Sequence, residues 1–122
     1  MTGLAAVAAA VPFTIAAPGS LDGLARDDVR LIGGSSDPGA LVTYGQGLGT
    51  IVVTEHTAGG TSNDASGLLA SLPSVSINGA TGHELVTALG TVVEYTSGGV
   101  SYTIAGSVTQ SDAESAARAL TS

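Results

Sequence analysis

Residues 90–120 read GTVVEYTSGGVSYTIAGSVTQSDAESAARAL and contain two alternating segments, a glycine turn and an amphipathic helix. In the second segment Val100, Tyr102 and Ile104 alternate with smaller residues, and this period of two marks a half-buried strand. Ser97-Gly98-Gly99 predicts a tight turn between the two strands. Beyond them the apolar spacing becomes helical. We therefore expect these core side chains: Val93, Tyr95, Val100, Tyr102, Ile104, Ala113, Ala116, Ala117 and Leu120.

The start of the C-terminal helix, expected over residues 109–121, is marked by two overlapping patterns. Thr109 with Asp112, and Ser111 with Glu114, each fit a capping box, in which a hydroxyl oxygen accepts a hydrogen bond from a backbone N–H of the first turn. The acidic side chains also suit the positive end of the helix dipole. A hairpin followed by a well-capped helix is thus the expected end of the domain.

Upstream of this unit, short apolar runs separated by turn residues predict further strands. Residues 51–56 are apolar on both faces for most of their length, which is typical of a central strand. Asn78-Gly79 is a strong hairpin signal. Residues 65–72 have the spacing of a short helix, which Asn63 or Asp64 would cap. The other predicted strands cover 29–32, 41–44, 75–77 and 85–89, after an extended apolar stretch at 13–16.

The N-terminal segment, residues 1–11, is rich in alanine and apolar. Leu4, Val7, Ala8 and Val11 share one helical face, so a short helix that stops before Pro12 is expected. The segment lacks the positive charges of a signal peptide and is too short to cross a bilayer. We expect the chain to be an internal piece of a longer protein. A trimmed signal or anchor remnant and a true start are the alternatives, and what precedes Thr2 stays open.

These features together predict one small domain over residues 1–122, in which residues 12–106 are mainly strands and turns. The expected fold is α+β, an antiparallel sheet of about five or six strands with the C-terminal helix packed on one face. A core with few large side chains would draw its stability from many small contacts and from the hydrogen-bonded sheet.

The charge balance excludes several classes of function. The formal net charge is −7, and the basic side chains besides histidine are Arg26, Arg30 and Arg118. Three arginines make no basic footprint for nucleic acid, and direct binding to an anionic lipid surface is disfavoured for the same reason. The lack of lysine and cysteine removes Schiff-base, P-loop lysine, thiolate and disulfide chemistry. We expect no cofactor, and partners that are apolar, neutral or cationic.

The residues that could carry chemistry are few. Gly45-Gln-Gly-Leu-Gly49 resembles part of a dinucleotide fingerprint, but a predicted strand follows it where that motif requires a helix, so a hairpin turn is expected. His56 and His83 each have an acidic neighbour, Glu55 and Glu84. Adjacent residues of a strand point to opposite faces, so neither pair is a natural chelate and both histidines are expected at the surface.

The serines, acids and tyrosines support binding or structure rather than a reaction. The chain has no G-x-S-x-G nucleophile elbow. Most acidic residues are expected in turns or at the helix start, whereas Glu94 lies in the middle of a strand and is expected to face solvent. Tyr95 and Tyr102 flank one hairpin and could form a cross-strand pair. They could also face a ligand if the sheet has an open face. We assign no catalytic, cofactor or metal residues.

Several stretches resemble a known family. Pro12-Phe13, Ala17-Pro18 and Leu21-Asp-Gly-Leu24 are similar to its opening, Val75–Gly79 and Gly82-His-Glu84 to its middle hairpin, and Val92–Tyr95, Gly98–Gly106 and Ala113–Leu120 to its closing strands and helix. The family that these stretches resemble is a small domain of unknown function in bacterial, mainly actinobacterial, cell-envelope proteins. It occurs C-terminal to LolA-like lipoprotein-carrier or RseB-like sensor modules, or in anti-sigma-type membrane proteins. This chain has Tyr95 where the family often has tryptophan.

The resemblance implies a setting and not a reaction. It implies an extracellular or cell-envelope location and an N-terminal module outside this chain. The first hypothesis is a non-catalytic accessory domain that contacts its own N-terminal module, another envelope protein or a peptide. The second is a carrier of an acyl chain or other apolar ligand, which requires a concave apolar pocket. The third is a hydrolase or metalloenzyme built on His56 or His83. The oligomeric state is left open.

Overall fold

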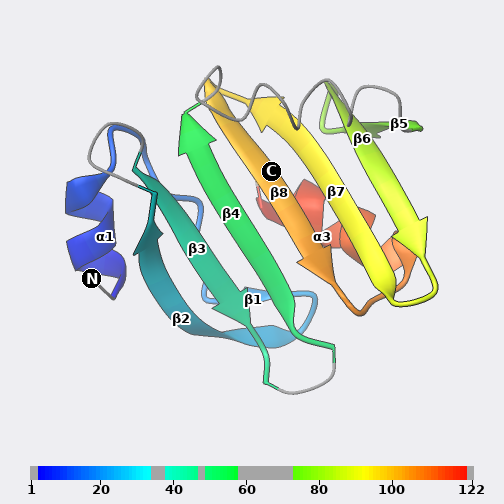
Figure 1. Cartoon of the computed structure of the whole chain (residues 1–122), viewed down its shortest axis with the longest axis horizontal. Coiled ribbons are helices and arrows are strands. Elements are labelled where there is room, and N and C mark those ends of the chain that lie inside the picture. The colour runs from blue at the N-terminus through cyan, green and yellow to red at the C-terminus, as the bar shows by residue number, and fades with distance from the viewer. Residues whose placement is uncertain (1–2, 34–37, 47–48, 58–72, 121–122) are drawn as a thin grey trace.

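The computed structural model describes residues 3–33, 38–46, 49–57 and 73–120. Eight strands form one antiparallel sheet in the order β1-β2-β3-β4-β8-β7-β6-β5 (Figure 1). The two helices are α1 (Leu4–Ala10) and α3 (Gln110–Leu120). The strands are β1 (Ser20–Leu21), β2 (Leu24–Ile32), β3 (Gly39–Tyr44), β4 (Ile51–Thr57), β5 (Ser74–Ile77), β6 (Ala80–Thr87), β7 (Gly90–Ser97) and β8 (Val100–Gly106).

The sheet consists of two four-stranded meanders that meet at its centre. Strands β1–β4 form one meander and β5–β8 the other, and the antiparallel pairing of β4 with β8 joins them. Tight turns make the short connections possible. Asn78 and Gly79 both have positive φ, at 51° and 90°, as a two-residue hairpin turn requires. The predicted hairpin at this position is confirmed, and so is the central position of β4.

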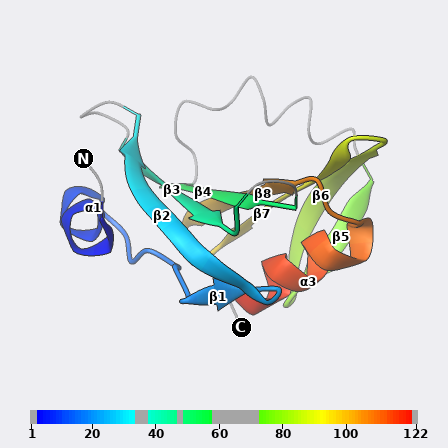
Figure 2. The same cartoon turned by 90° about the horizontal axis from the view of Figure 1, so that it is seen from below.

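The sheet curves into half of a barrel, and α3 lies in its concave side (Figure 2). The helix packs mainly on β7 and β8, and it also contacts the two edge strands β1 and β5. Its buried residues form one stripe, namely Ala113, Ala116, Ala117 and Leu120. Small alanine side chains allow the helix to approach the sheet closely. Helix α1 packs instead against β2, where the Gly3 amide donates to the Val29 carbonyl oxygen at 2.8 Å.

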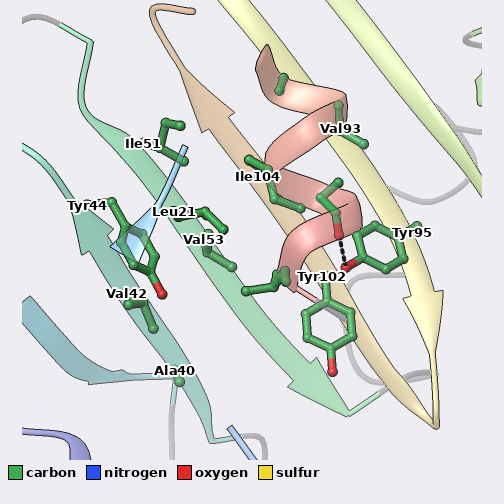
Figure 3. Packing of buried hydrophobic residues seen from close by; sticks show 14 of the residues in the cluster. Leu21, Ala40, Val42, Tyr44, Ile51, Val53, Val93, Tyr95, Tyr102 and Ile104 are labelled. Atoms are coloured by element: carbon green, nitrogen blue, oxygen red, sulfur yellow. Dashed lines mark hydrogen bonds between the residues drawn. The ribbon is translucent and has the colours of Figure 1, made fainter. Parts of the chain in front are cut away.

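The predicted core of the C-terminal hairpin and helix is confirmed. Tyr95 and Tyr102 are cross-strand partners, and their rings stack with centroids 5.1 Å apart. The Asp112 amide donates to the Thr109 hydroxyl oxygen at 3.2 Å, as one of the two predicted caps requires. All nine predicted core residues are at most 7% exposed (Figure 3).

The prediction of five or six strands is wrong, because the sheet has eight. Part of the difference is the β1–β2 hairpin, whose turn residue Asp22 takes a positive φ of 51°. Strand β2 also begins at Leu24, so Asp27 and Asp28 lie in a strand and not in a turn. The run of charged residues Arg26-Asp27-Asp28 hid the start of this strand, because it breaks the alternation of apolar and polar residues. Strand β6 is likewise longer than predicted at its start and ends at Thr87.

Three further sequence expectations concern the N-terminal helix, the extended stretch at 13–16 and the helix over 65–72. The N-terminal helix is confirmed at Leu4–Ala10, although within its seven residues only Val7 is buried. The extended stretch at 13–16 lies outside the sheet, in the segment 11–18 that follows α1. We call this segment the strap. The expected helix over 65–72 and its cap lie outside the described residues.

Candidate ligand-binding site

A pocket of about 510 Å³ lies between the strap and one end of the concave face. The strap contributes Pro12 to Ala16 to its wall, and the β7–β8 hairpin contributes residues on both sides of the turn. The last residue of α3, Leu120, completes the lining. Phe13 and Ile15 of the strap and Val100 of β8 contribute apolar side chains to the wall, while polar atoms make up about half of its lining surface.

Three hydrogen bonds hold the strap on the sheet. The Tyr44 hydroxyl donates to the Pro18 carbonyl oxygen at 2.9 Å, and Nη1 of Arg26 donates to the Ala17 carbonyl oxygen at 2.6 Å. The third bond runs in the other direction, from the Ala16 amide to Oε1 of Glu55 at 2.8 Å. Side chains of β2, β3 and β4 thus fix a segment that has no strand partner of its own.

Glu55 is the unusual residue at this site, because it is a fully buried acid. On β4 it follows Ile51 and Val53 on the inner face, and its cross-strand partners are Ala40 on β3 and Tyr102 on β8. Its side chain has no exposed surface, and Oε2 has no hydrogen-bond partner among the described residues. Burial raises the pKa of Glu55 to about 7, against the smaller opposing effect of the Ala16 N–H.

A second buried acid lies in the other half of the concave face. Oε1 of Glu84 accepts a hydrogen bond from Nε2 of Gln110 at 2.6 Å, at the start of α3. Burial raises the pKa of Glu84, and the neighbouring Glu114 carboxyl adds to this effect. Glu114 itself lies 3.5 Å from Nη2 of Arg118 on the next helical turn. Glu84 thus joins β6 to the helix. Its Oε2, like that of Glu55, has no hydrogen-bond partner among the described residues, and its partner Gln110 lines a separate pocket of about 310 Å³.

The structure places the two histidines on the outer face of the sheet. Glu55 and Glu84 point inward, so their neighbours His56 and His83 point outward, as the alternation predicted. Nδ1 of His83 lies 4.0 Å from Oε2 of Glu94, whose Oε1 accepts a hydrogen bond from the Ser101 hydroxyl at 3.4 Å. The described residues contain no group of three or more potential metal ligands.

Sequence reasoning missed Glu55 as a site residue, although the signal was present. The alternation of Ile51, Val53 and Glu55 places the carboxylate on the buried face of a strand that was predicted to be central. The strap was recognised only as an extended stretch. The segment Gly45–Gly49 connects the antiparallel strands β3 and β4, which confirms the hairpin interpretation over the dinucleotide fingerprint.

Comparison with protein-family models, with curated proteins and with solved structures gave no match to this chain. Within the part of the chain that the structure describes, no helix has the length and apolar character needed to cross a membrane.

Proposed function

We propose that this domain is a non-catalytic binding domain that holds a small amphipathic molecule in the pocket beneath the strap. The observation that carries the proposal is a pocket of about 510 Å³, two of whose lining residues adjoin Glu55, a buried carboxyl group with one oxygen that has no hydrogen-bond partner among the described residues. Ligand pockets commonly enclose about 300–1,000 Å³ and combine apolar walls with a few polar groups that orient the ligand. This pocket has that size, and its lining combines apolar side chains with polar groups.

The position of the pocket also supports binding. One wall is a half-barrel sheet whose backbone is fixed by hydrogen bonds to neighbouring strands. The opposite wall is the strap, which three hydrogen bonds attach. We expect a segment held by three single hydrogen bonds to open more easily than the sheet, which would allow a ligand to enter and then be covered. This arrangement favours a carrier of an acyl chain or other apolar ligand, which is the second of the three sequence hypotheses.

The test is displacement of a fluorescent apolar probe, N-phenyl-1-naphthylamine, together with a variant that fills the pocket. Thr14 is exposed and lines the pocket, so the Thr14→Trp side chain can fold into it without disturbing the core. We expect the wild type to enhance the fluorescence of the probe and Thr14→Trp to lose most of that enhancement. The matched control is Thr81→Trp, at an exposed position of β6 on the outer face. Equal probe binding by both variants would contradict the proposal.

A second candidate function is protein contact, as an accessory domain of an exported or membrane-anchored envelope protein. The observation that favours it is an apolar surface at the β6–β7 hairpin, where Leu85, Val86 and Leu89 are 43%, 53% and 87% exposed. Clustered exposed apolar side chains often mark interaction sites. The immobilised domain should then retain an envelope protein at micromolar concentration, and Leu89→Ser should reduce its retention. No retained protein would refute this candidate.

A further inference from the structure

Glu55, beside the pocket, has a buried oxygen atom without a hydrogen-bond partner in the described part of the chain, and this atom indicates which chemical group a ligand would bring. Glu55 has a carboxyl group with one oxygen bonded to the Ala16 amide and the other without a partner among the described residues. A buried polar atom that lacks a partner costs free energy, and a donor that reaches it recovers that cost. The missing donor is the feature to be explained.

The pocket and Glu55 share two neighbours. Ala16 and Tyr102 both line the pocket, and both adjoin Glu55, the first through its amide and the second as cross-strand partner. Glu55 therefore adjoins the pocket wall without lining the pocket itself. Ala16 belongs to the strap and not to the sheet. A ligand that binds Oε2 requires the strap to shift at Ala16.

The described residues that line the pocket carry no charged side chain, so the features around it decide which charge it favours. Leu120, the last residue of α3, lines it, so the C-terminal end of an 11-residue helix lies at its wall. The C-terminal end of a helix carries partial negative charge and favours cations. The chain as a whole has a net charge of −7. Arg26 of β2 donates its hydrogen bond to the Ala17 carbonyl oxygen of the strap and does not line the pocket.

We infer that the molecule held in this pocket is an apolar chain or ring that ends in a protonated amine, and that the amine binds Oε2 of Glu55. This inference rests on the proposed function and adds the chemical class of the ligand. An ammonium group supplies the missing donor and a charge that suits both the carboxylate and the helix end. A carboxylate head group would meet two negative partners. A hydroxyl group would supply a donor without the ion pair.

The experiment compares decylamine, decanol and decanoate as competitors of N-phenyl-1-naphthylamine at pH 8, where the amine is protonated. We expect decylamine to bind about tenfold or more tightly than decanol, and decanoate to bind least. Glu55→Gln should bring the affinity for decylamine down to that for decanol and leave decanol unchanged. The matched control is Glu94→Gln on the outer face, which should preserve the preference for the amine.

The outcomes separate the inference from the proposed function. If none of the three competitors displaces the probe, the proposed function is wrong. If decanol displaces it and decylamine is no better, or if Glu55→Gln keeps the preference for the amine, the inference is wrong and the pocket stands. A measurement on the wild-type protein tests the inference even if Glu55→Gln does not fold. Decylamine should shift the amide resonance of Ala16 more than decanol does, and equal shifts would overturn the inference.

Discussion

The two halves of the sheet are covered in different ways. The β5–β8 half lies under α3, whereas the strap lies over the inner face of the β1–β4 half. Each cover is tied down by a tyrosine. The Tyr95 hydroxyl donates to the Ala117 carbonyl oxygen of the helix at 3.0 Å (Figure 3), and the Tyr44 hydroxyl donates to the Pro18 carbonyl oxygen of the strap at 2.9 Å. Each cover also contacts one buried glutamate.

The difference lies in how each cover satisfies its own backbone. A helix bonds its amides and carbonyls internally, so α3 needs the sheet mainly for packing. The strap has no ladder, and the amide of Ala16 depends on the Glu55 side chain instead. A cover held by single side-chain bonds opens more easily than one held by a packed stripe. The pocket of about 510 Å³ lies where the strap meets the β7–β8 hairpin and the end of α3, and Glu55 of β4 adjoins it.

The largest expected effect on the free energy of unfolding comes from a cavity made in the core of each half. Ile104 on β8, beside α3, and Ile51 on β4 are both fully buried. An isoleucine-to-alanine change in a core costs about 2–5 kcal/mol, and more where the surroundings cannot collapse. We expect Ile104→Ala near the upper end, because a sheet and a helix hold its neighbours in place. We expect Ile51→Ala near the lower end, because Ile51 already lines a pocket of about 260 Å³.

Chemical denaturation of both variants measures this difference. Leu85→Ala serves as the control for the loss of an exposed apolar side chain, and it should change the free energy of unfolding by less than about 0.5 kcal/mol. Equal losses for Ile104→Ala and Ile51→Ala would mean that the two halves are equally rigid, and the comparison would fail.

The second effect is the dependence of stability on pH, which comes from Glu55. In the folded protein its pKa is raised to about 7 from an ordinary value of 4.5, so the folded state binds the proton more tightly than the unfolded state. The stabilisation is complete below about pH 4.5 and is lost as pH rises through about 7. A shift of this size corresponds to about 3 kcal/mol. Tyr44 and Tyr102, the neighbouring phenols, have raised pKa values and do not titrate in this range.

Glu55→Gln should remove the contribution of Glu55, so that the free energy of unfolding depends on pH less steeply but with the same sign. The remaining slope would come from Glu84, whose pKa is also raised. Free energies of unfolding measured from pH 5 to pH 8 give the slope for the wild type, Glu55→Gln and Glu84→Gln. A wild-type slope that persists in Glu55→Gln would show that Glu55 is not the titrating group.

The sequence predicted the half under α3 much better than the half under the strap. In residues 90–120 the strand period, the glycine turn, the cap and the helix stripe all agree, and each feature is local in sequence. The nine predicted core residues are buried as a result. Local agreement of this kind needs no knowledge of what lies across the fold.

The strap and the strand count depended on contacts that are distant in sequence. Ala16 and Glu55 are 39 residues apart, and no local pattern indicates that one covers the other. The predicted strand began only at Val29, because Asp27 and Asp28 disfavour a strand by propensity. Pairing with β3 overrides that preference. The alternation of Ile51, Val53 and Glu55 on β4 indicates a buried carboxyl group, but Glu55 was interpreted only as the neighbour of His56.

The smallest effect tests the two tyrosine anchors directly. Tyr95→Phe and Tyr44→Phe each remove one hydroxyl, and each leaves a carbonyl oxygen without that donor, on the helix and on the strap respectively. A single hydrogen bond of this kind contributes about 0.5–1.5 kcal/mol. Tyr95→Phe should lower the global free energy of unfolding, because its bond is buried in the core that unfolds as a unit. Tyr44→Phe should instead change little globally and speed amide exchange in the strap.

Native-state hydrogen exchange followed by NMR distinguishes the two responses. The amide of Ala16 should exchange faster in Tyr44→Phe than in the wild type, while the buried amides of β7 and β8 keep their protection. In Tyr95→Phe the protection of β7, β8 and α3 should fall together, since they open only with the whole domain. If Tyr44→Phe lowers the protection of β7 and β8 as much as that of Ala16, the strap opens only when the domain unfolds, and the rigid-wall, movable-wall description of the pocket must be abandoned.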